Sequence, residues 1–107
     1  MTGEQERRAA QRFSIQAPTE YANTKNGSGF TENVSLSGVR IEHTSNAISV
    51  DAELGMRFSF YYGSFETAFE GRVVRRTDNG FAVRFGPLDT EQMRVLRQAL
   101  ALSDGLP

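Results

Sequence analysis

The segment GRVVRRTDNGFAVRF constrains the fold more than any other part of the chain. Two runs with the residue types of strands, at 68–76 and 81–85, flank a short connection that contains Asn79-Gly80. An Asn-Gly pair is typical of tight turns between antiparallel strands, because both residues tolerate positive φ. The sequence therefore predicts a β-hairpin at this place.

Shorter strand patterns precede the hairpin. Residues 13–17 alternate between apolar and polar side chains, and Pro18 then interrupts the alternation. Residues 23–29 are rich in Asn, Gly and Ser, which is typical of a turn. A second alternating run covers residues 34–41, and its parity slips at Ser37-Gly38, which indicates a bulge or a tight turn.

The strand pattern continues in the middle of the chain after a loop. Residues 43–53 are expected to form that loop, with a short strand at 48–50, and residues 56–62 alternate again. Strands this short and this closely spaced are typical of a small barrel or sandwich. We predict one domain, built on a β-barrel over residues 13–87.

The C-terminal segment has the signals of a helix. Asp89 is placed to cap the helix N-terminus, and Gln92 occupies the position that completes a capping box. The apolar residues of the segment form a hydrophobic staple (Leu88 and Met93) and one helical stripe (Met93, Leu96 and Leu100). We predict a helix over residues 88–103 that covers apolar surface of the barrel, with Gly105 past its end.

Composition narrows the possible functions. The 107 residues include no cysteine and carry a formal net charge of -1, which argues against disulfides, thiolate metal sites and general nucleic-acid binding. His43 is the only histidine, and no serine lies in a nucleophile-elbow sequence. No apolar run approaches the roughly 18 residues that span a membrane, and the N-terminus lacks the apolar core of a signal peptide. We expect a cytoplasmic binding module without cofactor or metal, not an enzyme.

Three arginines lie close to the N-terminus. Arg8 and Arg12 form the pattern R-x-x-x-R, and Arg7 directly precedes it. Residues four apart point to roughly the same side of a strand or helix, so two guanidinium groups could converge on one phosphate. A solvated terminus is the alternative explanation, because residues 1–11 contain no large apolar side chain except Met1.

A second polar pattern, N-x-S-x-x-G, begins at Asn33. The apolar residues 34 and 36 alternate with Asn33 and Ser35, so we expect the apolar pair to face the core and the polar pair to face outward together. Their amide and hydroxyl groups can both donate and accept hydrogen bonds on the edge of a base. Gly38 permits close approach of the backbone where a Cβ would intrude. A bulged strand with polar outer residues would also explain the pattern.

Together the two patterns resemble the PilZ domain, a bacterial receptor for the second messenger cyclic di-GMP. That family carries R-x-x-x-R in its N-terminal segment and [D/N]-x-S-x-x-G on a later strand, and both occur here in that order. The segments RFSIQ, NVSLSGVRI, GRVVRRTDNGFAVRF and LDTEQMRVLRQAL are similar to its first strand, signature strand, late hairpin and helix. The resemblance implies a six-stranded antiparallel split barrel with a C-terminal α-helix and a flexible arm at residues 1–12.

The resemblance also implies roles for the motif residues. Arg8 and Arg12 would bind the phosphates of cyclic di-GMP and stack against its guanines. Asn33 and Ser35 would contact a guanine edge, and Gly38 would allow the backbone to approach closely. Asn33 stands where Asp is commoner in the family, and it lacks the charge of that acceptor.

Two further arginines gain expected roles from the same resemblance. An arginine at the position of Arg7 often accompanies a stacked pair of cyclic di-GMP molecules instead of a single one. Arg75 ends the run RVVR, at a strand position that often lines the same surface. A solvated arginine at a strand edge fits Arg75 nearly as well.

The resemblance implies signalling through a partner. The arm at residues 1–12 would order over the barrel when the nucleotide binds, and this would create a surface for an effector protein. Because the chain has no second domain, we expect the output to pass through a separate protein or through self-association. Control of biofilm, motility or polysaccharide follows from family membership alone, and neither DNA, RNA nor membrane insertion is expected.

Two other functions remain open. A degenerate member of the same family could serve as a protein-interaction module in pilus or motility assembly, although such members typically lack the arginine motif. A small barrel that binds single-stranded nucleic acid would need aromatic side chains on a basic groove. The candidates are a cluster that fits the core better: Phe58, Phe60, Tyr61, Tyr62 and Phe65.

Overall fold

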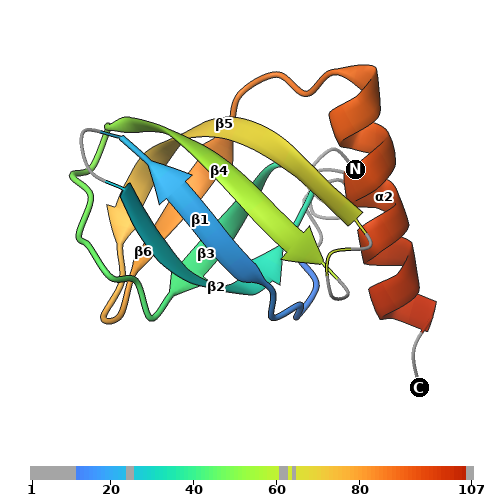
Figure 1. Cartoon of the computed structure of the whole chain (residues 1–107), viewed down its shortest axis with the longest axis horizontal. Coiled ribbons are helices and arrows are strands. Elements are labelled where there is room, and N and C mark those ends of the chain that lie inside the picture. Colours follow the sequence, from blue (N-terminus) through green and yellow to red (C-terminus); the bar gives the residue numbers. More distant parts are fainter. Residues whose placement is uncertain (1–11, 24–25, 61–62, 64, 106–107) are drawn as a thin grey trace, which may run out of the picture.

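Figure 1 shows the computed structural model, a six-stranded barrel with one helix across its end. It describes residues 12–23, 26–60, 63 and 65–105. The elements are β1 (Pro18–Ala22), β2 (Asn26–Val34), β3 (Gly38–Glu42), β4 (Glu53–Phe60), β5 (Phe65–Arg76), β6 (Phe81–Phe85) and α2 (Thr90–Gly105). Every strand is antiparallel to its neighbours in the order β1-β2-β3-β6-β5-β4, and pairing between β4 and β1 closes the barrel. The predicted six-stranded antiparallel barrel with a C-terminal helix is confirmed, whereas the expected flexible arm at residues 1–12 lies, except for Arg12, outside the described residues.

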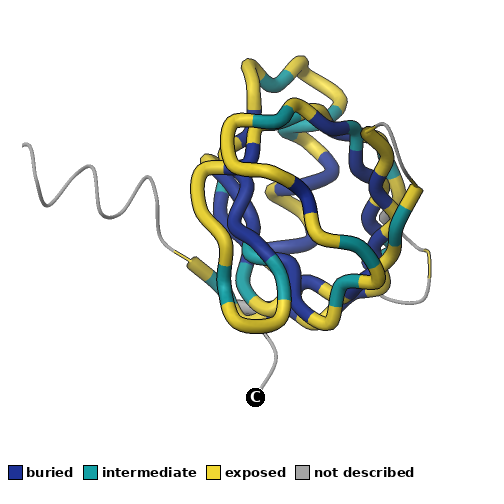
Figure 2. The backbone as a smooth tube through the Cα atoms, turned by 90° about the vertical axis from the view of Figure 1, so that its left-hand side faces the viewer, coloured by how far each residue is buried: buried dark blue, intermediate teal, exposed yellow. Residues whose placement is uncertain are grey.

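The core fills the inside of the barrel. Buried and exposed positions alternate along β4, as a strand with one face on the core requires (Figure 2). The ring centroids of Phe58 and Phe69 lie 5.3 Å apart, and those of Tyr21 and Phe81 lie 5.1 Å apart with the two rings nearly perpendicular. Contacts of this kind stabilise a core beyond the area that they bury.

The aromatic cluster considered for nucleic-acid binding contributes to this core. Phe58 and Phe60 are 0% and 1% exposed, so neither ring is available to stack on a base. The side chains of Tyr61, Tyr62 and Phe65 lie outside the described part of the chain.

Helix α2 covers one end of the barrel (Figure 1). It begins at Thr90, directly after the predicted cap Asp89, and it ends at Gly105, so the prediction that Gly105 lies past its end is wrong. Asp89 Oδ1 accepts a hydrogen bond from the Gln92 backbone N–H at 2.7 Å, and Gln92 Oε1 accepts one from the Asp89 N–H at 2.9 Å. This is the predicted capping box. Leu96 and Leu100 are buried in the barrel core, as the predicted stripe requires. No helix among the described residues is long and apolar enough to cross a membrane.

The predicted first strand is wrong. Residues 14–17 form no strand, Phe13 makes only an isolated bridge to Val34, and β1 begins at Pro18, the residue expected to interrupt. Proline is accepted as the first residue of a strand because it need not donate there. Residues 13–17 alternate because their apolar side chains pack on the core, while the backbone bonds to Thr31: Ala17 N–H donates to Thr31 Oγ1 at 2.8 Å.

The late hairpin is confirmed, but the Asn-Gly pair in its turn is not needed for the positive φ that the prediction assumed. Neither Asn79 nor Gly80 adopts positive φ. A Cβ on Gly80 would lie 1.9 Å from the carbonyl oxygen of Ile41, so glycine is required because the turn packs tightly against β3. The expected strand at 48–50 is absent, and residues 26–29, predicted as turn, belong to β2.

Candidate functional site

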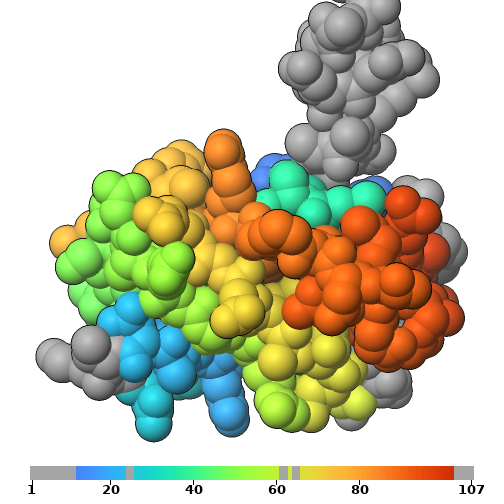
Figure 3. All heavy atoms as spheres, turned by 90° about the horizontal axis from the view of Figure 1, so that it is seen from above, coloured from blue at the N-terminus to red at the C-terminus, as the bar shows by residue number. Residues whose placement is uncertain are grey.

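The two sequence motifs meet at Arg12 and Asn33. The backbone groups of Phe13 and Val34 exchange two hydrogen bonds, with N···O distances of 2.8 and 2.9 Å. This bridge fixes the chain beside the end of β2, and Arg12 Nε donates a hydrogen bond to Asn33 Oδ1. Figure 3 shows the same neighbourhood, with blue atoms of the segment after residue 12 next to teal atoms of the turn between β2 and β3.

Strand register brings Arg75 to the same face. Asn33 of β2 pairs with Arg40 of β3, Arg40 pairs with Ala82 of β6, and Ala82 pairs with Arg75 of β5. Asn33, Arg40, Ala82 and Arg75 thus form one row across β2, β3, β6 and β5, on the outer face of the barrel. We call Arg12, Asn33, Arg40 and Arg75 the arginine surface.

Two irregularities in the ladder bring this row about. The register shifts between Thr31 and Asn33 and again between Val73 and Arg75. Each bulge inserts one extra residue and so reverses the side to which the following residues point. In a regular strand, residues two apart lie on the same face. Thr31 and Val73 are buried, so without the bulges Asn33 and Arg75 would also point inward.

The arginine surface concentrates positive charge. Burial lowers the pKa of Arg12, and the charges of Arg75 and Arg40 lower it further. Among the described residues neither Arg12 nor Arg75 forms an ion pair, whereas Arg57 pairs with Glu66 at 3.1 Å. Guanidinium groups that repel one another and have no carboxylate partner favour the binding of an anion.

Ser35 does not lie where the strand pattern places it. The chain turns after Val34 and β3 begins at Gly38, so the alternation of a continuous strand ends at this point. Ser35 is 0% exposed, and its Oγ accepts hydrogen bonds from the N–H groups of Ser37 at 3.1 Å and Gly38 at 3.2 Å. The prediction that Asn33 and Ser35 face outward together is therefore wrong for Ser35, which stabilises the turn.

Gly38 does allow a close approach, but to another strand. A Cβ at this position would lie 2.3 Å from the carbonyl oxygen of Val83 in β6. Glycine thus lets β3 lie against β6, and this pairing carries the row from Arg40 to Ala82. Arg7 and Arg8 lie outside the described residues, so their expected roles stay predictions.

Arg40 belongs to the arginine surface, although the sequence interpretation did not include it among the candidate site residues. It is the polar residue between buried Val39 and Ile41, so strand alternation alone would have placed it outward. Its Nε lies 3.3 Å from Glu42 Oε2 and 3.8 Å from Glu32 Oε2. What the sequence did not reveal is the register that sets Arg40 opposite Asn33.

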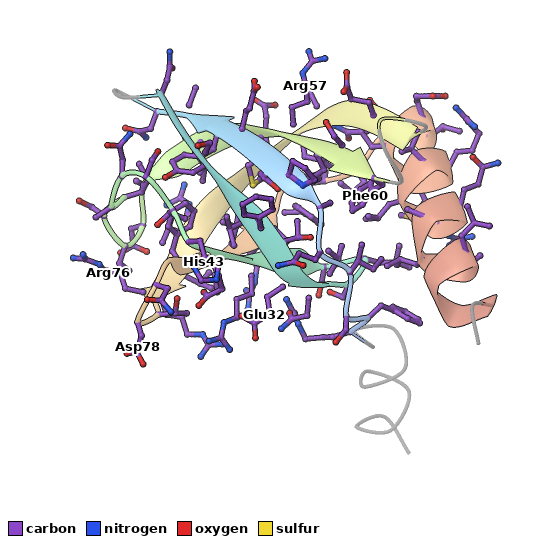
Figure 4. All side chains as sticks on the ribbon, turned by 60° about the horizontal axis from the view of Figure 1, so that its bottom comes forward. Glu32, His43, Arg57, Phe60, Arg76 and Asp78 are labelled. Carbon is purple, nitrogen blue, oxygen red and sulfur yellow. The ribbon has the colours of Figure 1, made fainter. Side chains whose placement is uncertain are left out.

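A recess of about 300 Å³ includes Glu32 and Glu42, the carboxylate partners of Arg40, but no residue of the arginine surface itself. Its lining consists of Ser14, Gln16, Phe30, Thr31, Glu32, Glu42 and His43, and Figure 4 shows Glu32 and His43 on the same side of the barrel. Larger hollows of about 760 and 850 Å³ lie over β4 and β5 and include no residue of the arginine surface. The candidate site is therefore defined by the charge and hydrogen bonds of the arginine surface and not by a cavity. In the described ranges no group of three His, Asp or Glu residues could hold a metal ion.

Comparison with known proteins identifies one family. Residues 6–102 match the family model described as PilZ domain. A solved structure, the PilZ domain of CeSA from a cellulose synthesizing bacterium, is similar to this chain with a TM-score of 0.69 and 20% sequence identity. The similarity covers 87% of this chain and 98% of that one, and it shows a common fold. No curated protein sequence matches the chain.

Proposed function

The chain belongs to the PilZ domain family, and from this premise we propose that it is a cyclic di-GMP receptor with a regulatory, non-catalytic role in the cytoplasm. The observation that carries the proposal is the hydrogen bond between Arg12 and Asn33. It joins the two halves of the family's binding pattern on one face of the barrel. Arg75 lies on the same face through the strand register.

The chemistry of this face fits the ligand. Cyclic di-GMP presents two phosphates and two guanines. A guanidinium fork can bind phosphate through two hydrogen bonds and can stack on a flat base, which suits Arg12 and Arg75. Asn33 can donate to and accept from a guanine edge.

Ser35 and Gly38 have a supporting role in this proposal. The buried Ser35 hydroxyl fixes the turn between β2 and β3, and Gly38 lets β3 reach β6. Both residues therefore keep Asn33 and Arg40 at fixed positions. A direct contact of Ser35 with guanine would require the turn to open.

The arginines before the barrel complete the proposed site. Arg8 would provide the second guanidinium of R-x-x-x-R, and Arg7 would decide whether one nucleotide or a stacked pair is held. Ordering of the segment before Arg12 over the ligand would create the surface that an effector protein recognises. Ordering costs free energy, which the charge-assisted bonds to phosphate offset.

Calorimetric titration with cyclic di-GMP tests this function. We expect a dissociation constant near the micromolar range, which corresponds to about -8 kcal/mol. The double variant Arg8→Ala, Arg12→Ala should lose binding, while Arg57→Ala, on the far side of the barrel (Figure 4), should bind like the wild type. Wild-type protein that gives no heat at about 100 times that concentration would contradict the proposal.

A further inference from the structure

Arg40 lies in the middle of the arginine surface but differs from its neighbours. It pairs with Asn33 on one side and, through Ala82, adjoins Arg75 on the other. Its guanidinium contacts two carboxylates, whereas within the described residues Arg12 and Arg75 contact none. The two carboxylates hold it in different ways.

Glu42 is a fixed partner. Its side chain is only 7% exposed and accepts a hydrogen bond from Thr77 Oγ1 at 2.6 Å, in the connection between β5 and β6. Arg40 Nε donates to the same Oε2 atom at 3.3 Å. Glu42 therefore anchors Arg40 through Nε. The hydrogen bond and charge of Glu42 raise the pKa of Arg40, so the guanidinium stays charged.

Glu32 is a loose partner. Its side chain is 53% exposed, and its Oε2 lies 3.8 Å from Arg40 Nε, beyond hydrogen-bond distance. It is the residue inserted by the bulge between Thr31 and Asn33, directly before the motif. Its negative charge thus lies at the edge of the arginine surface, beside Arg40.

The guanidinium of Arg40 has donors left for a ligand. Arginine offers five N–H donors, and both carboxylates approach closest through Nε. A phosphate that reaches the terminal nitrogens must also come near Glu32. The exposed carboxylate then repels the phosphate and competes with it for the same cation.

We propose that Arg40 is a further phosphate-binding residue of this site, and that Glu32 weakens binding by competing with the ligand for Arg40. The proposal rests on the proposed function, because it assumes that cyclic di-GMP binds at the arginine surface. Glu42 keeps Arg40 in place, and Glu32 reduces the attraction between the positive charge of Arg40 and the phosphate of the ligand.

Titration of charge-neutral variants with cyclic di-GMP tests the proposal. Arg40→Gln should weaken binding by roughly tenfold or more, the effect of one lost charge-assisted hydrogen bond. Arg40→Lys keeps the positive charge but loses the planar guanidinium, so its affinity should lie between those of the wild type and Arg40→Gln. Glu32→Gln should strengthen binding by about threefold, the size expected for an exposed charge pair. When Arg40→Gln is already present, Glu32→Gln should increase the affinity for cyclic di-GMP by less than about threefold.

The pair Arg57 and Glu66 provides matched controls. Their ion pair is exposed like that of Glu32 and Arg40, and Figure 4 shows Arg57 on the side of the barrel opposite Glu32. Arg57→Gln and Glu66→Gln should leave the affinity unchanged. Thermal unfolding of each variant shows whether a loss of binding reflects a loss of fold.

The outcomes separate the two proposals. If the wild-type protein binds and the folded Arg40→Gln and Glu32→Gln variants bind equally well, the inference about Arg40 is wrong and the receptor function stands. If Glu32→Gln gains as much affinity without Arg40 as with it, Glu32 does not compete for Arg40, and this part of the inference is overturned. If the wild type does not bind, both proposals fail.

Discussion

Arg12 Nε donates a hydrogen bond to Asn33 Oδ1 and so joins two motifs that lie 21 residues apart in the sequence. The contact depends on the bridge between Phe13 and Val34, which fixes the first described residues against the end of β2. Arg40 and Arg75 extend the same face across β3, β6 and β5. Three arginines and one amide are thereby gathered on one side of the barrel.

Asn33→Ala should weaken cyclic di-GMP binding by about tenfold with little change in stability. The amide would no longer contact the base, and a lost hydrogen bond that involves a charged or buried partner costs roughly 1.5–3 kcal/mol. Asn26→Ala, at the other end of the same strand, is the matched control because the substitution keeps the backbone oxygen that accepts a hydrogen bond from Asn46 Nδ2. Equal affinities for the two variants would remove Asn33 from the site.

Ser35→Ala should destabilise the fold by about 1–3 kcal/mol, because the N–H groups of Ser37 and Gly38 lose a buried acceptor. Urea unfolding measures this loss, with Ser28→Ala on the exposed side of β2 as the control. A Ser35→Ala variant that keeps its stability but no longer binds nucleotide would instead assign Ser35 a direct contact with the ligand.

Gly38→Ala should also destabilise the protein, by about 1–3 kcal/mol, the usual range for overpacking. The new Cβ would lie 2.3 Å from backbone oxygen of Val83, which cannot move without separating β3 from β6. Gly55→Ala is the control, since its Cβ would meet no atom closer than 4.0 Å. Similar unfolding midpoints for both variants would show that the two strands do not require glycine at position 38.

The successes and failures of sequence interpretation have physical causes. The hairpin around Asn79-Gly80 and the helix after Asp89 were predictable because their signals are local: alternation, turn residues and a capping box. The slip in the alternation at Ser37-Gly38 indicated a bulge or a tight turn, and a turn does join β2 to β3 there. Because this turn already begins after Val34, Ser35 belongs to it and was wrongly placed on the outer face. Pro18 was interpreted as a break, although the first position of a strand accepts proline.

The arginine surface could be predicted only in part. Family resemblance pointed to Arg12, Asn33 and Arg75, but it gave no reason for their proximity. Their common face depends on two bulges and on strand pairings that are remote in sequence. Because a shift of one residue turns a side chain to the other face, the role of Arg40 becomes visible only when the register is known.

Asp89→Ala should lower stability by about 1 kcal/mol, the typical cost of removing an N-cap. The Gln92 N–H would lose its acceptor, and the first turn of α2 would fray where it meets β5. Asp89→Asn keeps a capping oxygen and should retain nearly all of the stability. Thermal unfolding distinguishes the two, and equal losses would show that the capping box does not stabilise the helix.

The most direct test of the receptor function is a titration of ¹⁵N-labelled protein with cyclic di-GMP, followed by amide NMR. We predict saturable shifts at Arg12, Asn33, Arg40 and Arg75, and none at Arg57 or Glu66. Shifts confined to the surroundings of Arg57 and Glu66, with none at the arginine surface, or no shifts at all at millimolar nucleotide, would contradict the account.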